Sequence, residues 1–317
     1  MVFRPAFTLL LLLLSSSPSS SSSVSELSVS FDNTTRHALV FVPSGADLTA
    51  PIPVVLNFHA LASDPAAQML MSDMNTIAER ENFVVVYPRG LEGAQVWTPL
   101  PAPGPTYSLN GGGCCPAACS KGADDVGYTR FLLDEYLEDE LRLTFDRSRI
   151  YATGMSNGGF MTNRVGCEMS DVIAAIAPVS GPLMNGASIA WKSDPFECDI
   201  TRPVPVLHMH GLADIIVPFN GDRLLSFPKI EDSVNGWASR NGLGDDVKWT
   251  SSYENGDVAC DSAGANSNNV TLCRIKGGGH SWPGAPGGLC PEHGPFACTR
   301  DIVASEEIWR FFSSKSL

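Results

Sequence analysis

Basic residues are scarce in this chain. Its 317 residues include 21 Lys and Arg against 34 Asp and Glu, a formal net charge of −13. A surface of this sign repels nucleic acid and anionic lipid headgroups, so we expect no nucleic acid and no membrane as partner. The charge favours a neutral substrate instead. We also expect the protein to be a monomer.

Long apolar runs are equally scarce. The N-terminal run, Phe7 to Leu14, follows the basic Arg4 and precedes a series of serines. That order is typical of a secretory signal peptide, which we place at residues 1–23; the run is too short to span a bilayer. A retained N-terminal anchor is the alternative. No later segment approaches the ~18 apolar residues of a spanning helix, so we expect a secreted, extracellular protein.

The sequence has no internal repeat and no abrupt change of composition after residue 23. Predicted strands alternate with predicted helices, as in a mostly parallel sheet covered on both faces. We therefore predict one α/β domain over residues 24–317. The expected strands are 27–31, 37–42, 54–58, 83–87, 150–153, 172–179, 204–210, 247–253 and 270–276, and the expected helices are 64–81, 124–143, 160–169, 230–240 and 301–312.

Nine cysteines follow the signal peptide, an odd number that leaves one unpaired if the others form disulfides. Cys260 with Cys273, and Cys290 with Cys298, close short loops and are the pairs we expect. The cysteines are Cys114, Cys115, Cys119, Cys167, Cys198, Cys260, Cys273, Cys290 and Cys298.

The irregular segment 91–122 contains three of these cysteines. We expect Cys114 or Cys115 to pair with Cys167 and so tether that segment; a free, buried Cys167 is the alternative. Zinc held by Cys115 and Cys119 is the competing interpretation, but in a secreted chain we expect no metal. Two N-glycosylation sequons, beginning at Asn33 and Asn269, agree with secretion.

The segment 150–159 carries the strongest functional pattern. A β-branched and aromatic run predicts a buried strand, and Gly154-Met155-Ser156-Asn157-Gly158 follows it as G-x-S-x-G, before a predicted helix. Strand, tight turn and helix form the context of a nucleophile elbow, in which flanking glycines leave room for a strained serine. We predict that Ser156 is a catalytic nucleophile rather than an ordinary turn serine.

Ser156, Asp214 and His280 each lie just past the C-terminal end of a predicted strand. Sites in open α/β sheets form at that edge. A serine hydroxyl is a poor nucleophile at neutral pH, so a histidine must take its proton and a carboxylate must orient the imidazole. We expect His280 to be the general base and Asp214 to be its carboxylate partner.

Both assignments have competitors. His208 and His210 lie on or at the end of one strand, and His210 also fits a buried core histidine beside the site. His293 lies in a loop between two cysteines and is expected on the surface. Three further aspartates occupy turn contexts, where aspartates are usually solvated: Asp222, Asp245 and Asp257.

An oxyanion hole needs two backbone N–H groups. One belongs to the residue after the nucleophile, Asn157, and the other to a loop after an early strand. The segment 57–61 occupies that place, so we expect the N–H of Leu61, with that of Ala60 as the alternative. We place His59 among the substrate-binding residues, as a structural hydrogen-bonding residue rather than a catalyst. Trp282, two residues after the base, is expected to line the pocket with an aromatic wall, and simple packing of its loop is the alternative.

Several of these motifs occur together in one known group of proteins. They are Gly113-Cys114-Cys115, Asp124 to Tyr128, Tyr151 to Gly159, Ala174 to Val179, Pro205 to Asp214, Gly277 to Gly284 and Thr299 to Ile302. In this set and order the chain resembles the secreted feruloyl esterase and polyhydroxybutyrate depolymerase-like esterases of the α/β-hydrolase superfamily, over about residues 39–312. One departure is Ala60, where the family usually has glycine after the histidine.

The resemblance implies an α/β-hydrolase fold, a triad of Ser156, Asp214 and His280, and no metal or organic cofactor. It implies hydrolysis of carboxylic esters on a polysaccharide or polyester, and we expect a feruloyl esterase acting on feruloylated xylan. A polyhydroxybutyrate depolymerase and an acetylxylan esterase are alternatives of the same class. A peptidase, or a non-catalytic interaction protein on a hydrolase fold, are alternatives of other classes.

Overall fold

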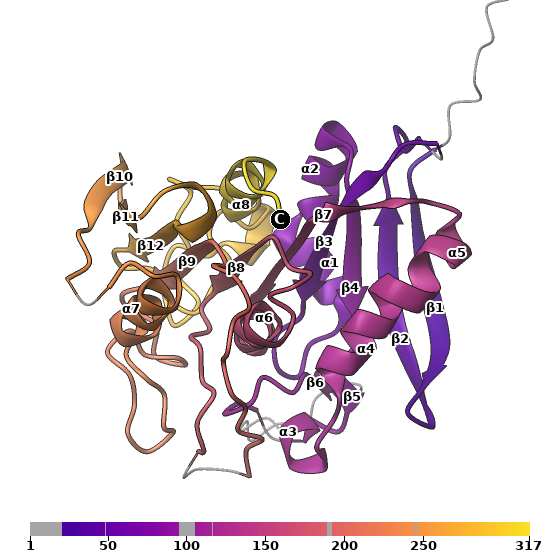
Figure 1. The fold of residues 1–317 in the computed structure, drawn as a ribbon. Coiled ribbons are helices and arrows are strands. Elements are labelled where there is room, and N and C mark those ends of the chain that lie inside the picture. The colour runs from indigo at the N-terminus through magenta and orange to yellow at the C-terminus, as the bar shows by residue number, and fades with distance from the viewer. Residues whose placement is uncertain (1–20, 48, 95–104, 116, 189–191, 245) are drawn as a thin grey trace, which may run out of the picture.

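The computed structural model describes residues 21–47, 49–94, 105–115, 117–188, 192–244 and 246–317. Its centre is a sheet of ten strands in the order β1-β2-β4-β3-β7-β8-β9-β12-β11-β10 (Figure 1). The six strands from β4 to β12 are parallel to their neighbours in that order, and the two outer strands on each side are antiparallel. The mostly parallel α/β architecture expected from the sequence is therefore confirmed.

The strands of the main sheet are β1 (Ser23–Phe31), β2 (Thr34–Val42), β3 (Ile52–Phe58), β4 (Val84–Pro88), β7 (Phe145–Met155), β8 (Ala175–Val179), β9 (Val206–Gly211), β10 (Thr250–Asn255), β11 (Val258–Ala263) and β12 (Val270–Ile275). The helices are α1 (Pro65–Ser72), α2 (Met74–Glu81), α3 (Ala118–Lys121), α4 (Asp125–Phe131), a π-helical turn (Leu132–Tyr136), α5 (Leu137–Leu141), α6 (Asn157–Glu168), α7 (Ile230–Arg240) and α8 (Ala304–Ser313). A two-stranded sheet of β5 (Leu91–Glu92) and β6 (Tyr107–Ser108), and the 3₁₀ turns Asn266–Asn268 and Gly287–Leu289, complete the described elements.

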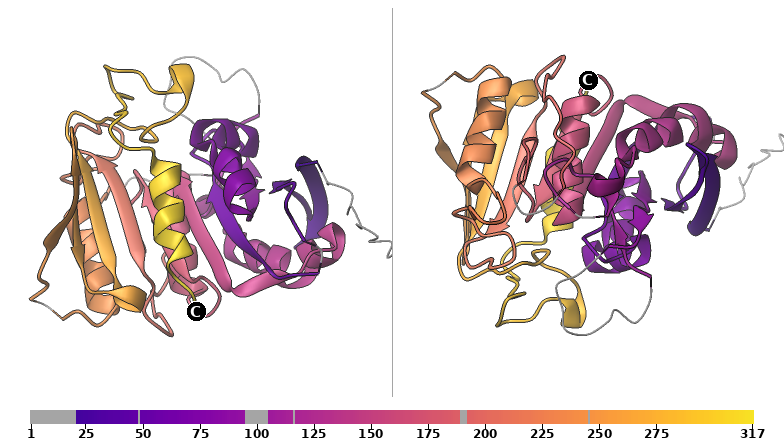
Figure 2. Two further views of the ribbon diagram at one scale, coloured as in Figure 1. Left: turned by 90° about the horizontal axis from the view of Figure 1, so that it is seen from above. Right: turned by 90° about the horizontal axis from the view of Figure 1, so that it is seen from below.

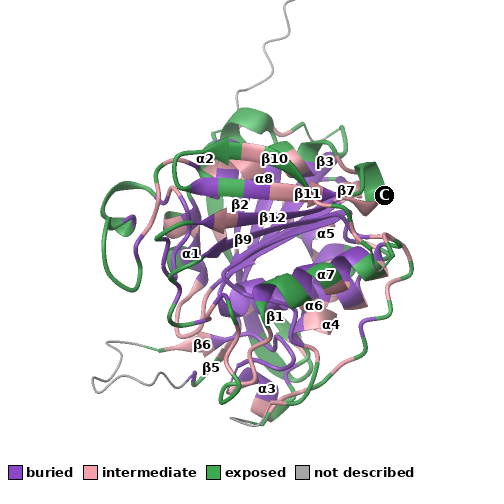
Figure 3. Ribbon diagram, turned by 90° about the vertical axis from the view of Figure 1, so that its left-hand side faces the viewer, coloured by how far each residue is buried: buried purple, intermediate pink, exposed green. Residues whose placement is uncertain are grey.

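The central strands are continuous apolar runs because both of their faces are covered. Successive side chains of a strand point to opposite faces: Val54 and Leu56 belong to the core beneath α4, α6 and α7, whereas Val55 belongs to the core beneath α2 and α8. Figure 2 shows helices on the two sides of the sheet, and Figure 3 shows the buried strands between them.

Two predicted helices differ from the observed ones. The expected helix over 64–81 does begin at Asp64, whose carboxylate caps the N–H of Ala67, but it is interrupted at Asp73, which has φ 49°. The left-handed residue ends α1 and lets α2 start in a new direction. The expected helix over 124–143 contains the π-helical turn. Strand β11 was not predicted, because its sequence, VACDSA, lacks an apolar alternation.

The segment 91–122, expected to be irregular, contains only short elements in its described part. Its C-terminal half is anchored by Asp125, which is buried and receives hydrogen bonds from the Arg36 guanidinium and from the backbone N–H of Asn110, the latter at 2.6 Å. Asn110 in turn donates its side-chain amide to Ala123 O and to the carboxylate of Asp194. These contacts fix a segment that has little secondary structure of its own.

The described residues form four disulfides, and two of them were predicted. Cys260 pairs with Cys273 across β11 and β12, and Cys290 pairs with Cys298. The expected tether from Cys114 or Cys115 to Cys167 is wrong. Cys167 on α6 pairs with Cys198 of the second irregular segment, Cys114 and Cys115 form a disulfide with each other, and Cys119 is a buried free thiol.

Two irregular segments of the chain contain cysteines that could pair with Cys167 on α6. The sequence does not show which of the two segments packs next to Cys167 in the fold. Most of the predicted signal peptide, residues 1–20, lies outside the described residues. Within the part of the chain that is described, no helix has the length and apolar character to cross a membrane.

The Cys167–Cys198 disulfide closes a loop with a sequence separation of 31, which is expected to stabilise the protein by about 4 kcal/mol through the restricted unfolded chain. Replacing both residues by alanine should therefore lower the free energy of unfolding in urea by up to that amount. As a matched control, removing Cys290–Cys298, with a separation of 8, should cost only about 2.5 kcal/mol. Peptide mapping without reduction should join Cys167 to Cys198; a link from Cys167 to the 114–115 pair would contradict the structure.

Candidate active site

The three residues predicted to act together lie at one edge of the parallel sheet. Ser156 directly follows β7, Asp214 lies three residues beyond β9, and His280 lies beyond β12. Strands β7, β8, β9 and β12 are parallel neighbours in that order, so their carboxyl ends lie side by side. The loop carrying His280 crosses the end of β9, because Ala213 donates its N–H to Gly278 O at 2.8 Å.

The turn that presents Ser156 is strained and tightly packed. Ser156 has φ 56° and is the N-cap of α6, a conformation that costs a non-glycine residue free energy and is retained where surrounding contacts impose it. A Cβ on Gly158 would lie 2.0 Å from Phe58 O, and one on Gly154 would lie 2.6 Å from the same atom. Both glycines are therefore required by the approach of β3, as the G-x-S-x-G pattern predicts.

Asp214 and His280 form a direct hydrogen bond. Nδ1 of His280 donates to Oδ2 of Asp214 at 2.7 Å, and both side chains are almost entirely buried. The other carboxylate oxygen accepts the backbone N–H groups of Ile216 and Val217 at 2.8 and 2.9 Å. The bond leaves Nε2 of His280 as the ring nitrogen available for a serine proton. The described residues show no hydrogen bond between the Ser156 hydroxyl and His280, and in unliganded sites such contacts often tighten only with substrate.

The electrostatics keep Asp214 ionised. Burial alone would raise the pKa of Asp214, but hydrogen bonds and charge from His210 and His280 outweigh burial and hold that pKa well below its usual range. A carboxylate in this state stabilises the imidazolium that forms when His280 takes up a proton.

The backbone around the predicted oxyanion hole is held firmly. The N–H of Asn157 belongs to the first turn of α6, where backbone donors have no acceptor within the helix. The side-chain amide of Asn157 both accepts from Leu109 N and donates to Leu109 O, each at 2.8 Å. The loop 59–61 lies against the elbow, because a Cβ on Gly158 would also approach His59 O to 2.9 Å. The loop after β3 and the start of α6, which carry the two predicted oxyanion donors, therefore lie together. The second donor stays a prediction, the N–H of Leu61 or that of Ala60.

The structure buries His59 and Trp282, which favours the structural roles considered for them, and their substrate-binding roles stay predictions. The His59 ring is fully buried; Nε2 accepts the N–H of Gly90 at 3.0 Å, and Nδ1 donates to Ala60 O at 2.8 Å. Burial lowers the pKa of His59 to about 4, so the ring is neutral at physiological pH. Trp282 is 1% exposed and donates its indole N–H to Ser305. Both side chains are used in packing, and neither presents an accessible surface to a ligand.

An apolar cluster lies beside the elbow instead. Its buried members are Cys114, Cys115, Phe160, Met184 and Val217, with Leu61 and Phe227 packed against them. Phe160 is in the first turn of α6, and its ring stacks on Phe227 with centroids 5.7 Å apart. We call this set the elbow cluster. It combines residues near the nucleophile, in the loop of Asp214 and in the predicted oxyanion loop. The sequence indicates only one of its members, Phe160, by its position next to the elbow.

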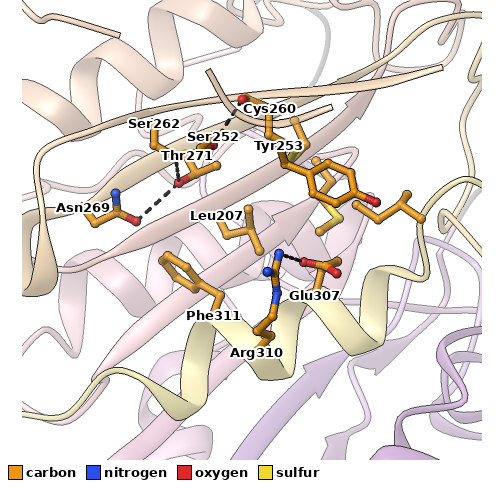
Figure 4. Close-up of a pocket in the computed structure, with 13 residues that line it drawn as sticks. Leu207, Ser252, Tyr253, Cys260, Ser262, Asn269, Thr271, Glu307, Arg310 and Phe311 are labelled. Carbon is orange, nitrogen blue, oxygen red and sulfur yellow. Dashed lines mark hydrogen bonds and ion pairs between the residues drawn. A yellow bond between two sulfur atoms is a disulfide. The ribbon is translucent and has the colours of Figure 1, made fainter. Parts of the chain in front are cut away.

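A separate hollow of about 270 Å³ lies over β9–β12 beside α8 (Figure 4). It is lined by Leu207, Thr271, Tyr253, Arg310 and Phe311, among others, and contains no member of the predicted triad. We therefore do not assign it to the active site.

Where the structure describes them, the histidines and aspartates considered as alternatives to His280 and Asp214 do not join the triad. His293 and Asp257 are exposed, Asp222 caps the N–H of Leu225, and Asp245 lies outside the described residues. His210, considered above as a core histidine next to the site, is buried and approaches Asp214. Among the described residues, no group of three or more His, Cys, Asp or Glu is arranged to hold a metal ion.

An elbow serine and a bonded His–Asp pair on the carboxyl edge of a parallel sheet define the α/β-hydrolase fold class. A solved acetyl xylan esterase from Aspergillus awamori has the same fold, with a TM-score of 0.62 over 92% of this chain and 99% of that one, at 14% identity. No family model matches the chain.

Sequence relatives carry the comparison further. The chain is 29% identical over 255 residues to feruloyl esterase B of Piromyces equi, covering 78% of this chain and 42% of the relative. It is 30% identical over 184 residues to a bifunctional acetylxylan esterase/xylanase of Neocallimastix patriciarum, covering 58% and 22%. It is 28% identical over 145 residues to poly(3-hydroxyalkanoate) depolymerase C of Paucimonas lemoignei, covering 44% and 30%. These relatives are carboxylic ester hydrolases of the predicted kinds, which confirms the resemblance, although the chain spans less than half the length of each.

The fit of Gly158 against β3 is directly testable. Gly158→Ala should prevent correct packing of the elbow, because its Cβ would meet the Phe58 carbonyl at 2.0 Å and backbone cannot move aside cheaply. We expect a loss of more than about 3 kcal/mol in urea unfolding. The matched control is Gly186→Ala, an exposed position with nothing within 4 Å of its Cβ, which should change stability by less than about 0.5 kcal/mol. Equal stability of the two variants would contradict this account of the elbow.

Proposed function

We propose that this protein is a serine esterase that hydrolyses carboxylic esters through an acyl-enzyme. The observation that carries the proposal is the 2.7 Å hydrogen bond between His280 and Asp214, on the same sheet edge as the strained Ser156. Serine hydrolases require these three groups in these relative roles. The sequence relatives named as feruloyl and acetylxylan esterases support the same reaction class.

The chemistry follows from the roles of the three side chains. His280 takes the proton of Ser156 as the hydroxyl oxygen attacks the ester carbonyl, and Asp214 stabilises the resulting imidazolium. The oxyanion receives hydrogen bonds from the N–H of Asn157 and from that of Leu61 or Ala60. His280 then protonates the leaving alcohol, and a water molecule, activated by the same imidazole, releases the acid from the serine.

For the substrate we propose a feruloyl ester on plant xylan. The elbow cluster is mostly buried, but its partly exposed members Leu61 and Phe227 give it an apolar edge next to the nucleophile, which suits a planar phenolic acyl group. The acidic protein surface suits a neutral polysaccharide. Acetylated xylan and polyhydroxybutyrate are the alternatives, and relatives named for both occur among the sequence matches.

The remaining features of the proposal concern the whole protein. We propose that residues 1–23 are a signal peptide, that 24–317 form one catalytic domain, and that the enzyme acts outside the cell as a monomer without a cofactor. Four disulfides among the described residues support an oxidising compartment.

The nucleophile and the substrate are tested together by following acid release from methyl ferulate, acetylated xylan and polyhydroxybutyrate. We expect the native protein to favour methyl ferulate. Ser156→Ala should lower kcat by a factor on the order of 10⁶, because alanine keeps the turn but removes the attacking oxygen. Circular dichroism controls for folding of the variant. A folded Ser156→Ala protein with a tenth of native turnover would rule out this nucleophile, whereas preference for another ester would revise only the substrate.

The base is tested by comparing two histidines. His280→Ala should abolish hydrolysis, because no other group at the edge is bonded to Asp214 in the orientation needed to accept the serine proton. His293→Ala is the matched control, since its side chain is exposed, and should retain native kcat. Activity of the native enzyme should rise with pH as a histidine loses its proton. If His293→Ala were inactive and His280→Ala active, the site would have to move to the loop closed by Cys290 and Cys298.

A further inference from the structure

Two buried histidines on β9 extend the contacts of Asp214 away from the serine. Nε2 of His210 lies 2.8 Å from Val217 O and 3.4 Å from Oδ2 of Asp214. Nδ1 of His210 lies 3.2 Å from Nε2 of His208. The two rings are stacked, with centroids 5.4 Å apart, and neither is accessible to solvent. The triad mechanism described above uses neither of them.

The hydrogen-bond partners fix where the protons are. A carbonyl oxygen only accepts, so Nε2 of His210 must carry a hydrogen, which it points at Val217 O; Oδ2 of Asp214 lies 3.4 Å from the same nitrogen. Burial first and the neighbouring His210 second lower the pKa of His208 well below the ordinary value, so the His208 ring carries a single proton. When the second nitrogen of His210, Nδ1, carries no proton, it accepts from the facing Nε2–H of His208.

The contacts of His210 also hold the loop that carries Asp214, through Val217. Val217 donates its N–H to Oδ1 of Asp214 and accepts from His210 through its carbonyl oxygen. The carboxylate therefore has two backbone donors on Oδ1 and the His280 N–H on Oδ2, and Nε2 of His210 lies 3.4 Å from Oδ2. Val217 is also a member of the elbow cluster, so His210 connects the acid to the wall beside the nucleophile.

We propose that His210 is a positioning residue of the active site, acting through Asp214 and held in its Nε2–H tautomer by His208. It keeps the carboxylate in the orientation that His280 requires, and its nearby N–H partly offsets the negative charge on Oδ2. This inference rests on the proposed esterase function, because its kinetic consequence is read in ester hydrolysis.

No other charged group next to Asp214, among the described residues, could replace the His210 imidazole. The titratable groups next to Asp214 are His210 and His280. Arg274 pairs with His210 across β9 and β12, but its guanidinium is engaged by Glu231 of α7 and Asp261 of β11. The ring of Phe219, edge-on to His210, is apolar. Removal of the His210 N–H therefore leaves Oδ2 with His280 as its nearest donor.

The first test reads the tautomer in the native protein and does not depend on activity. Nitrogen-15 NMR of the histidine rings, assigned with the His208→Phe and His210→Gln variants, should show His210 protonated at Nε2 above neutral pH. A His210 ring protonated only at Nδ1 would overturn the inference. This measurement also decides the matter if His210→Phe fails to fold.

The second test is kinetic, with a chromogenic short-chain ester. His210→Phe keeps the ring volume but loses the donor, so kcat should fall roughly 10- to 100-fold through misplacement of the triad. The acid limb of the pH profile should move to higher pH, because an Asp214 carboxylate without the nearby His210 imidazole attracts a protonated base more strongly. His210→Gln, which retains an N–H near the position of Nε2, should recover most of the activity and the native acid limb.

A third arm separates positioning through Asp214 from simple packing. In an Asp214→Asn background, His210→Phe should cost little further activity, because the group it acts through is already lost. Native kcat and acid limb in His210→Phe would overturn the inference, as would equal impairment of the Phe and Gln variants with an unchanged acid limb. Failure of the esterase function itself is distinguishable, since the native enzyme would then hydrolyse no ester at all.

Discussion

The end of β3 and the first turn of α6 approach each other so closely that only glycine fits between them. Gly158 leaves 2.0 Å between the place of a Cβ and the carbonyl oxygen of Phe58. Because β3 and β7 are adjacent parallel strands, this contact determines how sharply the chain turns after Met155. The positive φ of Ser156 and the approach of His59 O, in the loop after β3, to the same glycine belong to this close packing.

The loops around this turn have little secondary structure and are held by buried polar groups. The side-chain amide of Asn157 forms two hydrogen bonds with the backbone of Leu109, accepting from its N–H and donating to its carbonyl oxygen. Asp125 anchors the same segment through Arg36 and Asn110, and burial raises the pKa of Asp125 although the guanidinium of Arg36 counteracts it. Buried polar groups that are hydrogen-bonded in this way favour one arrangement, because an alternative arrangement would leave their donors and acceptors unsatisfied.

Asp214 illustrates how a carboxylate is kept charged in the interior. Its own burial opposes ionisation, and three hydrogen-bonding N–H groups together with the nearby His210 imidazole reverse that tendency. The donors come from β9, from the loop that follows it and from the loop after β12. An acid assembled in this way depends on the order of the strands in the sheet as much as on the residues themselves.

The sequence by itself predicted the α/β class, the elbow turn, Asp214 and His280 as neighbours, and two of the four disulfides seen among the described residues. These features have local signals: a glycine pattern around Ser156, polar residues at strand ends, and cysteines that close short loops. Only the tertiary structure decided that Cys167 pairs with Cys198, that His59 and Trp282 are buried, and that His210 approaches Asp214. Each of these depends on which distant segment packs against which, and burial or pairing between segments far apart in the chain leaves no periodic or spacing signal in the sequence.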